Sequence, residues 1–112
     1  MRMWLVPPKL MCRQHLLGEH VEIHMLVGTI KRNKSVQGYV DNNLIDTSLI
    51  QSRHDEIVQE MLERGYNHKS ELQYTDALHV GKVDSEHSLE ELSRRCPGCR
   101  ERIENEKRDA AS

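Results

Sequence analysis

The chain has 112 residues, of which 37% are hydrophobic and none is Phe, and its formal net charge is −2. This length favours one domain, residues 1–112, with a modest core of Leu, Ile, Val and Met. Three cysteines, an odd number, argue against a secreted disulfide framework. No apolar run is long enough for a signal peptide or a membrane span, so we expect the protein to work in a reducing cytoplasm.

The charges are unevenly distributed along the chain. Residues 1–35 carry a net charge of +4, residues 36–60 a net charge of −4, and the remainder a net charge of −2. A basic front can attract a polyanion locally, although the whole chain is slightly acidic. An ordinary mixture of solvated charges is the alternative, and the charge pattern alone leaves both open.

Hydrophobic spacing predicts an all-α fold, a compact single domain of about three main helices with long irregular loops. Residues 1–8 are expected to form an extended arm, because the residue before a proline avoids the α region and this segment contains Pro7 and Pro8. The first helix is expected at about 9–32. The polar stretch 33–47 is expected to be irregular.

The second helix is expected to begin with a capping box. Ser48 would be its N-cap, with Gln51 three residues further on. Apolar residues follow at helical spacing, and Gly65 supplies a left-handed residue that ends the helix. Residues 66–86 are expected to be irregular.

The third helix is expected to begin at a second capping box, formed by Ser88 and Glu91. Pro97-Gly98 should break or kink this helix, which can continue from residue 99 to 107. Residues from about 104 to 112 are expected to form a flexible tail.

The first predicted helix has neighbouring polar and apolar stripes. His15, Glu19 and Glu22 stand at i, i+4 and i+7, so they share one face of a helix. Leu16 and Ile23 belong to the adjacent apolar stripe, which is wide enough to pack on a core. A solvated glutamate and a carboxylate with acid–base chemistry both fit this pattern, and periodicity does not separate them.

Two patterns have the spacing of metal ligands. His20 and His24 are at i and i+4, which suits two zinc ligands, although the glutamate between them is misplaced for the His-Glu-x-x-His protease motif. Cys96 and Cys99 form a Cys-x-x-Cys pair, and a complete site would also need Cys12 and a histidine. A tight turn is the simpler interpretation of the cysteine pair, and zinc stays open as an alternative.

Two segments of the sequence match a known pattern. The first consists of Gln14, His15, Leu16, Glu19, Glu22 and Gly28, and the second is the run Arg64-Gly65-Tyr66-Asn67-His68-Lys69-Ser70. At these spacings the chain resembles the pyrimidine-dimer DNA glycosylases, the phage endonuclease V family. The resemblance covers about residues 1–70 and extends more loosely to about 103.

The resemblance implies a DNA repair glycosylase with associated abasic-site (β-elimination) lyase activity, acting through a Schiff base on pyrimidine dimers or a related damaged or modified base. A carboxylate at the position of Glu22 is catalytic in this family, and the position of Met1 corresponds to the residue whose α-amine is the nucleophile. An α-amine titrates more than about two pH units below a lysine side chain, so more of it is neutral near pH 7. His15 is expected to contact substrate or to orient Glu22. This mechanism needs no metal and no organic cofactor.

The expected partner is double-stranded DNA containing damaged or modified bases or abasic sites, bound by a monomer in a bacterial cell or phage-infected host, with no role for a membrane. The candidate phosphate contacts are Arg2, Lys9, Arg13, Lys31, Arg32 and Lys34, and a second strand contact is expected from Asn67, His68 and Lys69. Two alternatives of other classes are a non-catalytic DNA-binding phage accessory protein on the same scaffold and a small zinc-binding protein that uses Cys96 and Cys99.

Overall fold

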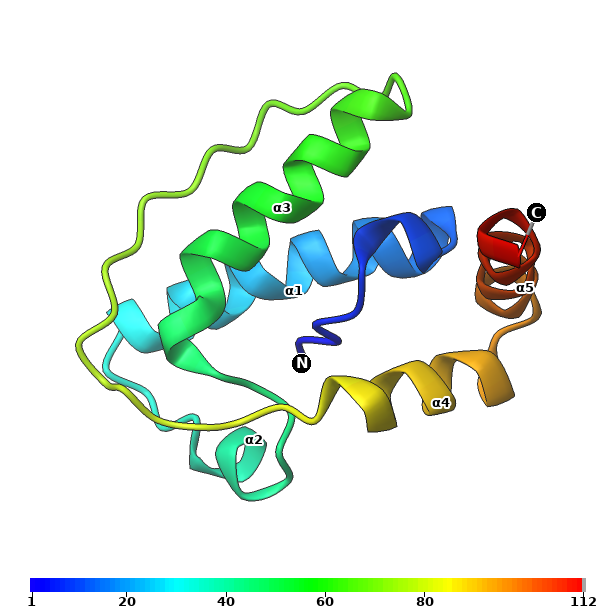
Figure 1. Cartoon of the computed structure of the whole chain (residues 1–112). Coiled ribbons are helices and arrows are strands. Elements are labelled where there is room, and N and C mark those ends of the chain that lie inside the picture. Colours follow the sequence, from blue (N-terminus) through cyan, green and yellow to red (C-terminus); the bar gives the residue numbers. More distant parts are fainter. Residues whose placement is uncertain (112) are drawn as a thin grey trace.

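The computed structural model describes residues 1–111, and over those residues the chain folds into helices and loops without a strand (Figure 1). The helices are α1 (Arg13–Lys31), α2 (Gln37–Asp41), α3 (Ile50–Glu63), α4 (Ser85–Arg95) and α5 (Pro97–Ala111). The all-α expectation is confirmed. None of the helices in this part of the chain is both long and apolar enough to cross a membrane.

The amino-terminal arm is a structural element of the core. Met3, Trp4 and Val6 are buried, and the amide of Met3 donates a hydrogen bond of 2.7 Å to the carbonyl of Leu44. The first helix begins later than expected, because Pro8–Leu10 form a separate 3-10 turn and the backbone extends again before α1 starts. The arm and this turn lie against α1 and α3.

The helix pair α1 and α3 forms the centre of the core. Leu16 and Ile23 of α1 and Ile50 and Ile57 of α3 are fully buried, as their helical spacing predicts. Gly65 has a φ of +81° and ends α3, so the expected left-handed stop is confirmed.

The polar stretch between α1 and α3 is more ordered than expected. It contains the short helix α2, which passes through Gly38. The expected capping box at Ser48 is wrong, because the side chain of Asp46 accepts a hydrogen bond from the Ser48 amide and starts a 3-10 turn. Gln51 instead reaches the loop after α3, where its amide nitrogen donates to the carbonyl of Leu72.

The second expected capping box is wrong too, because the helix begins one turn earlier. Asp84 is the N-cap of α4, and its carboxylate accepts hydrogen bonds from the amides of Glu86 and His87. Aspartate is as good an N-cap as serine, so the earlier residue begins the helix. Ser88 therefore lies inside α4, where it is buried.

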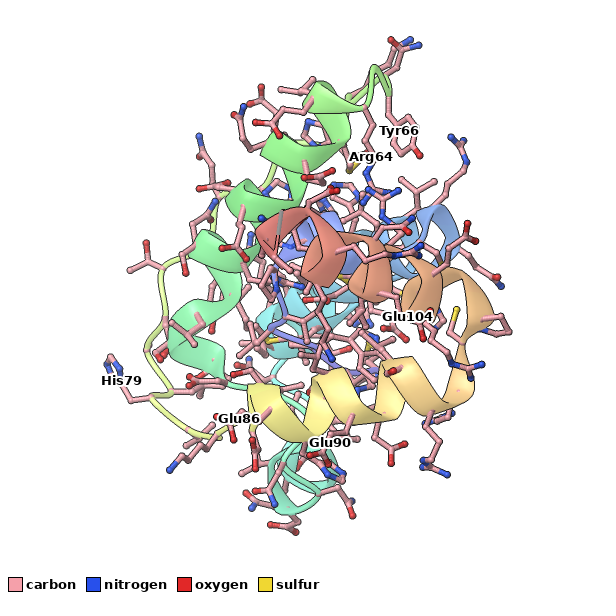
Figure 2. All side chains as sticks on the ribbon, turned by 45° about the vertical axis from the view of Figure 1, so that its right-hand side comes forward. Arg64, Tyr66, His79, Glu86, Glu90 and Glu104 are labelled. Carbon is pink, nitrogen blue, oxygen red and sulfur yellow. The ribbon has the colours of Figure 1, made fainter. Side chains whose placement is uncertain are left out.

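The loop from 66 to 84 is irregular, as expected, and it is held by a few polar contacts. Asp76 accepts hydrogen bonds from the hydroxyls of Thr47 and Tyr74. Gly81 has a φ of +92°, and a Cβ at this position would lie 2.2 Å from the carbonyl oxygen of Ile45, so only glycine fits. His79 projects outward from the same loop (Figure 2).

The expected third helix is two helices, because Pro97 begins α5 directly after α4 has ended. α5 packs against α4 and the turn at Pro8–Leu10. The residues expected as a tail are helical from 104 to 111, and Ser112 lies outside the described residues. Lys9 forms an ion pair of 2.7 Å with Glu106, so the end of α5 contacts the start of the chain.

Candidate functional site

Arg2 lies between α1 and α4. Its guanidinium carbon is 3.6 Å from the centroid of the Trp4 ring, which is the geometry of a cation–π contact. Its Nη2 donates a hydrogen bond of 3.2 Å to the buried hydroxyl of Ser88. The Nε atom of Arg2 is buried and has no hydrogen-bond partner among the described residues. The arm therefore holds this side chain firmly, with one of its donors buried and unpaired in the described chain.

A hollow of about 300 Å³ lies where the arm meets α1. Its walls are formed by Arg2, Trp4, Gln14, His15, Gly18, Glu19 and Glu22. Three of the predicted site residues, Arg2, His15 and Glu22, thus line one concavity. Met1 directly precedes Arg2, and its half-buried side chain packs against the core. We call this concavity the arm hollow.

The two glutamates of the arm hollow have different surroundings. Glu22 is half-buried and takes part in no ion pair within residues 1–111. Glu19 is buried, and its carboxylate accepts two hydrogen bonds from Arg53 on α3, at 2.6 and 2.9 Å. Burial alone would lower the pKa of Arg53, but the hydrogen bond and charge of Glu19 raise it above its ordinary value. Glu19 is a structural carboxylate, and Glu22 is available for chemistry.

Sequence reasoning missed Arg53. The signal was present, because Arg53 stands at helical spacing between the apolar residues Ile50 and Ile57, on the face that α3 buries. A charged residue on a buried face needs a partner of opposite charge. Glu19, on the corresponding face of α1, is that partner.

His15 faces two ways. Its Nδ1 is 3.3 Å from the sulfur of Cys12 and 3.6 Å from the sulfur of Cys99. Its ring also meets the Trp4 ring edge-on, with centroids 5.7 Å apart. Burial lowers the pKa of His15, and the positive charge of Arg95 lowers it further.

The expected DNA contacts do not converge on one point. Arg13, at the start of α1, lies 4.5 Å over the Tyr66 ring, whereas Lys31 is at the other end of α1. Arg32 and Lys34 follow Lys31 and are exposed. Because α1 has 19 residues, the two basic groups are separated by about 28 Å of helix. Lys9 is engaged by α5 through its ion pair.

The second expected DNA-contacting segment follows α3. Asn67 and Lys69 are exposed, but His68 turns inward and its Nε2 is 3.1 Å from Nε2 of His20. His54 of α3 and His24 of α1 complete a cluster of four imidazoles, with neighbouring ring centroids 4.8 to 5.5 Å apart. Sequence spacing identified the pair on α1, and packing adds the other two rings.

Burial and the neighbouring imidazoles disfavour protonation of the two histidines on α1. Burial, followed by the charges of His24, His54 and His68, lowers the pKa of His20 to about 4. Burial, followed by the charges of His54 and His68, lowers the pKa of His24, and a backbone hydrogen bond at Ser70 partly opposes this shift. His20 and His24 are therefore uncharged, polar parts of the interface between α1 and α3 at neutral pH.

A family model described as pyrimidine dimer DNA glycosylase matches residues 1–74. This match spans more than half of the chain and includes the arm, α1 and α3. The chain belongs to the pyrimidine dimer DNA glycosylase family, which confirms the resemblance seen in the sequence. No curated protein and no solved structure gives a significant match.

Replacing Glu19 by Gln should strongly destabilise the fold. The variant removes the buried counter-charge of Arg53 and leaves only the exposed carboxylate of Glu56 beside the guanidinium. Loss of one partner of a buried ion pair typically costs about 3–5 kcal/mol, and Glu56 should keep the loss toward the lower end of that range. Urea unfolding followed by circular dichroism should show this loss as a lower midpoint at unchanged slope. A midpoint equal to that of the unaltered protein would show that Arg53 does not depend on Glu19.

The histidine cluster predicts a loss of stability in mild acid. The folded state holds His20 at a pKa of about 4, and an unfolded chain has it near its ordinary 6.5. As the pH falls from 6.5 to 4, the unfolded state therefore binds the proton first, and stability falls by about 1–3 kcal/mol before levelling off.

Thermal unfolding at several pH values between 7.5 and 4 measures this slope. The variant His20→Leu should flatten the slope between pH 6.5 and 4. The exposed His79, replaced by Gln, is the matched control and should leave the slope unchanged. If both variants keep the slope of the unaltered protein, another group causes it.

Proposed function

We propose that this protein is a DNA repair glycosylase with associated abasic-site lyase activity, acting on pyrimidine dimers or a related damaged base in double-stranded DNA. The observation that carries this proposal is the arm hollow. There an unpaired carboxylate, Glu22, lies beside Arg2, and Arg2 directly follows Met1, whose α-amine is the proposed nucleophile. Membership of the glycosylase family supports the same conclusion.

The proposed reaction begins with the neutral α-amine of Met1. Its lone pair forms a bond to C1′, and the glycosidic bond breaks with its electron pair leaving on the base, which takes up a proton. Opening of the C1′–O4′ bond then gives a Schiff base. Loss of the C2′ proton moves electrons toward C3′ and expels the 3′ phosphate, and water finally releases the amine.

Glu22 has two roles in this scheme. Its negative charge stabilises the cationic sugar that develops as the base departs, and its carboxylate carries protons during ring opening. Glu19 cannot share this work, because both of its oxygens accept hydrogen bonds from Arg53 in the core. One carboxylate of the arm hollow is therefore assigned to the reaction.

His15 assists from the same face of α1, two helical turns before Glu22. Its Nδ1 is occupied by the sulfurs of Cys12 and Cys99, so Nε2 is the nitrogen left for substrate or for orienting Glu22. Arg2 supplies a second polar contact, because its side chain lines the same hollow and its positive charge can attract a phosphate oxygen of the bound DNA.

The remaining DNA contacts are proposed to lie along α1. Its two basic ends are about 28 Å apart, which is the length of roughly eight base pairs. Lys31, Arg32 and Lys34 would hold the backbone at one end and Arg13 at the other, with Asn67 and Lys69 near the second strand. Lys9 and His68 would join them only by leaving their partners Glu106 and His20. Glu86 and Glu90 project from α4 and Glu104 from α5, which makes that face unfavourable for DNA (Figure 2).

Replacing Glu22 by Gln should reduce glycosylase turnover by a factor of about 100 or more, because charge stabilisation and proton transfer are both lost. Stability should change by no more than about 0.5 kcal/mol, since Glu22 is half-buried and unpaired among residues 1–111. Single-turnover cleavage of an oligonucleotide with one pyrimidine dimer measures the rate. Turnover at the original rate would remove Glu22 from the mechanism.

The amine of Met1 should be the atom that becomes linked to DNA. Borohydride reduction in the presence of abasic-site DNA traps a Schiff base, and peptide mass mapping should locate the adduct on residue 1. Acetylating the amine should abolish trapping, because an amide nitrogen cannot form an imine.

A matched control separates the amine from the side chain of Met1. Another residue at position 1 with an unblocked amine should trap DNA as well as Met1 does. An adduct on Lys9 or Lys69 would indicate a lysine-based lyase. A blocked protein that still traps DNA, or an unblocked one that binds DNA without trapping, would refute the proposed nucleophile.

A further inference from the structure

Four side chains with affinity for soft metals meet at the junction of α1 with the α4–α5 turn. Cys12 and His15 come from the start of α1, and Cys96 and Cys99 from the turn. The ligand atoms of all four lie within 4.8 Å of one another. The two pairs are 84 residues apart in the chain, and none of the cysteines forms a disulfide.

The distances match the edges of a tetrahedron around zinc. With Zn–S bonds of about 2.3 Å and Zn–N bonds of about 2.05 Å, two sulfurs should lie about 3.8 Å apart, and a sulfur and a nitrogen about 3.6 Å apart. The sulfurs of Cys12 and Cys96 are 3.8 Å apart. Nδ1 of His15 is 3.3 Å from the first of these cysteines and 3.6 Å from Cys99.

The backbone is arranged to support negative sulfur atoms. The amide of Cys12 points at the sulfur of Cys99 at 3.3 Å, and the amide of Cys99 points at the sulfur of Cys96 at 3.4 Å. Hydrogen bonds of this kind stabilise the thiolate form that binds metal. Gly98 keeps the turn compact, since a Cβ there would lie 3.1 Å from the Cβ of Cys12.

We propose that Cys12, His15, Cys96 and Cys99 bind one Zn²⁺ ion in a structural site. Three sulfurs and one nitrogen fill a tetrahedral coordination shell, which leaves no position for a water or a substrate. The ion would join the family-matched residues 1–74 to the two C-terminal helices outside that match. The site stabilises the fold and shares only His15 with the proposed reaction, whose Nδ1 would hold the metal while Nε2 stays free. Its test measures bound metal and does not depend on glycosylase activity.

Protein purified without chelators should contain about one zinc per chain by elemental analysis. Replacement by Co²⁺ should give an intense thiolate-to-cobalt charge-transfer absorption together with the visible bands of tetrahedral cobalt. Removal of the metal by a chelator should lower the Tm and expose all three thiols to alkylation. These measurements use the unaltered protein and do not require any variant to fold.

The variant Cys96→Ser should bind zinc at least about 100-fold more weakly, because it removes one ligand that is itself half-buried. His54→Gln, which alters the four-imidazole cluster, is the matched control and should keep the metal. Zinc-free protein that is unaffected by chelators would refute the site. A disulfide between Cys12 and Cys96, or cobalt that binds without charge-transfer absorption, would refute it equally. The same holds if His54→Gln loses the metal while Cys96→Ser keeps it.

Discussion

The buried guanidinium of Arg53, on α3, connects the arm and α1, the two parts of the chain that line the arm hollow. It donates to Glu19 of α1 at 2.6 and 2.9 Å and to the carbonyl of Val6 in the arm at 2.6 Å. A guanidinium cannot give up its charge, so the core must keep an ionised carboxylate and a correctly placed carbonyl beside it. Apolar packing tolerates small shifts of one helix against another, whereas this set of hydrogen bonds defines one position for the arm, α1 and α3.

This constraint separates the two carboxylates of the arm hollow. Glu19 and Glu22 are three residues apart on one helix face, and two unpaired carboxylates so close together would repel each other. Arg53 neutralises Glu19 within the core, which leaves Glu22 as the unpaired carboxylate at the opening. The same ion pair therefore holds the arm in place and leaves one acidic group for the reaction that we propose.

Features determined by local spacing could be predicted from the sequence, and features determined by distant contacts could not. Periodicity predicted the all-α class, and Gly65 predicted the end of α3. The cap expected at Ser88 was wrong because the neighbouring Asp84 caps α4 instead, and the hydrogen bond that Ser88 accepts from Arg2, 86 residues away, could not be predicted. In the same way the Cys-x-x-Cys spacing was visible, but the histidine that accompanies it, His15, could be identified only after the helices were packed together.

The C-terminal helices lie outside the family match, yet three of their hydrogen bonds reach the arm and the start of α1. Ser88 of α4 accepts a hydrogen bond from Arg2, and the sulfur of Cys99 accepts one from the amide of Cys12. Arg102 of α5 donates to the carbonyl of Lys9. An extended arm has no internal hydrogen bonds of its own and gains its order from what packs against it. Residues 75–111 therefore help to hold the arm against α1, and the arm hollow depends on both halves of the chain.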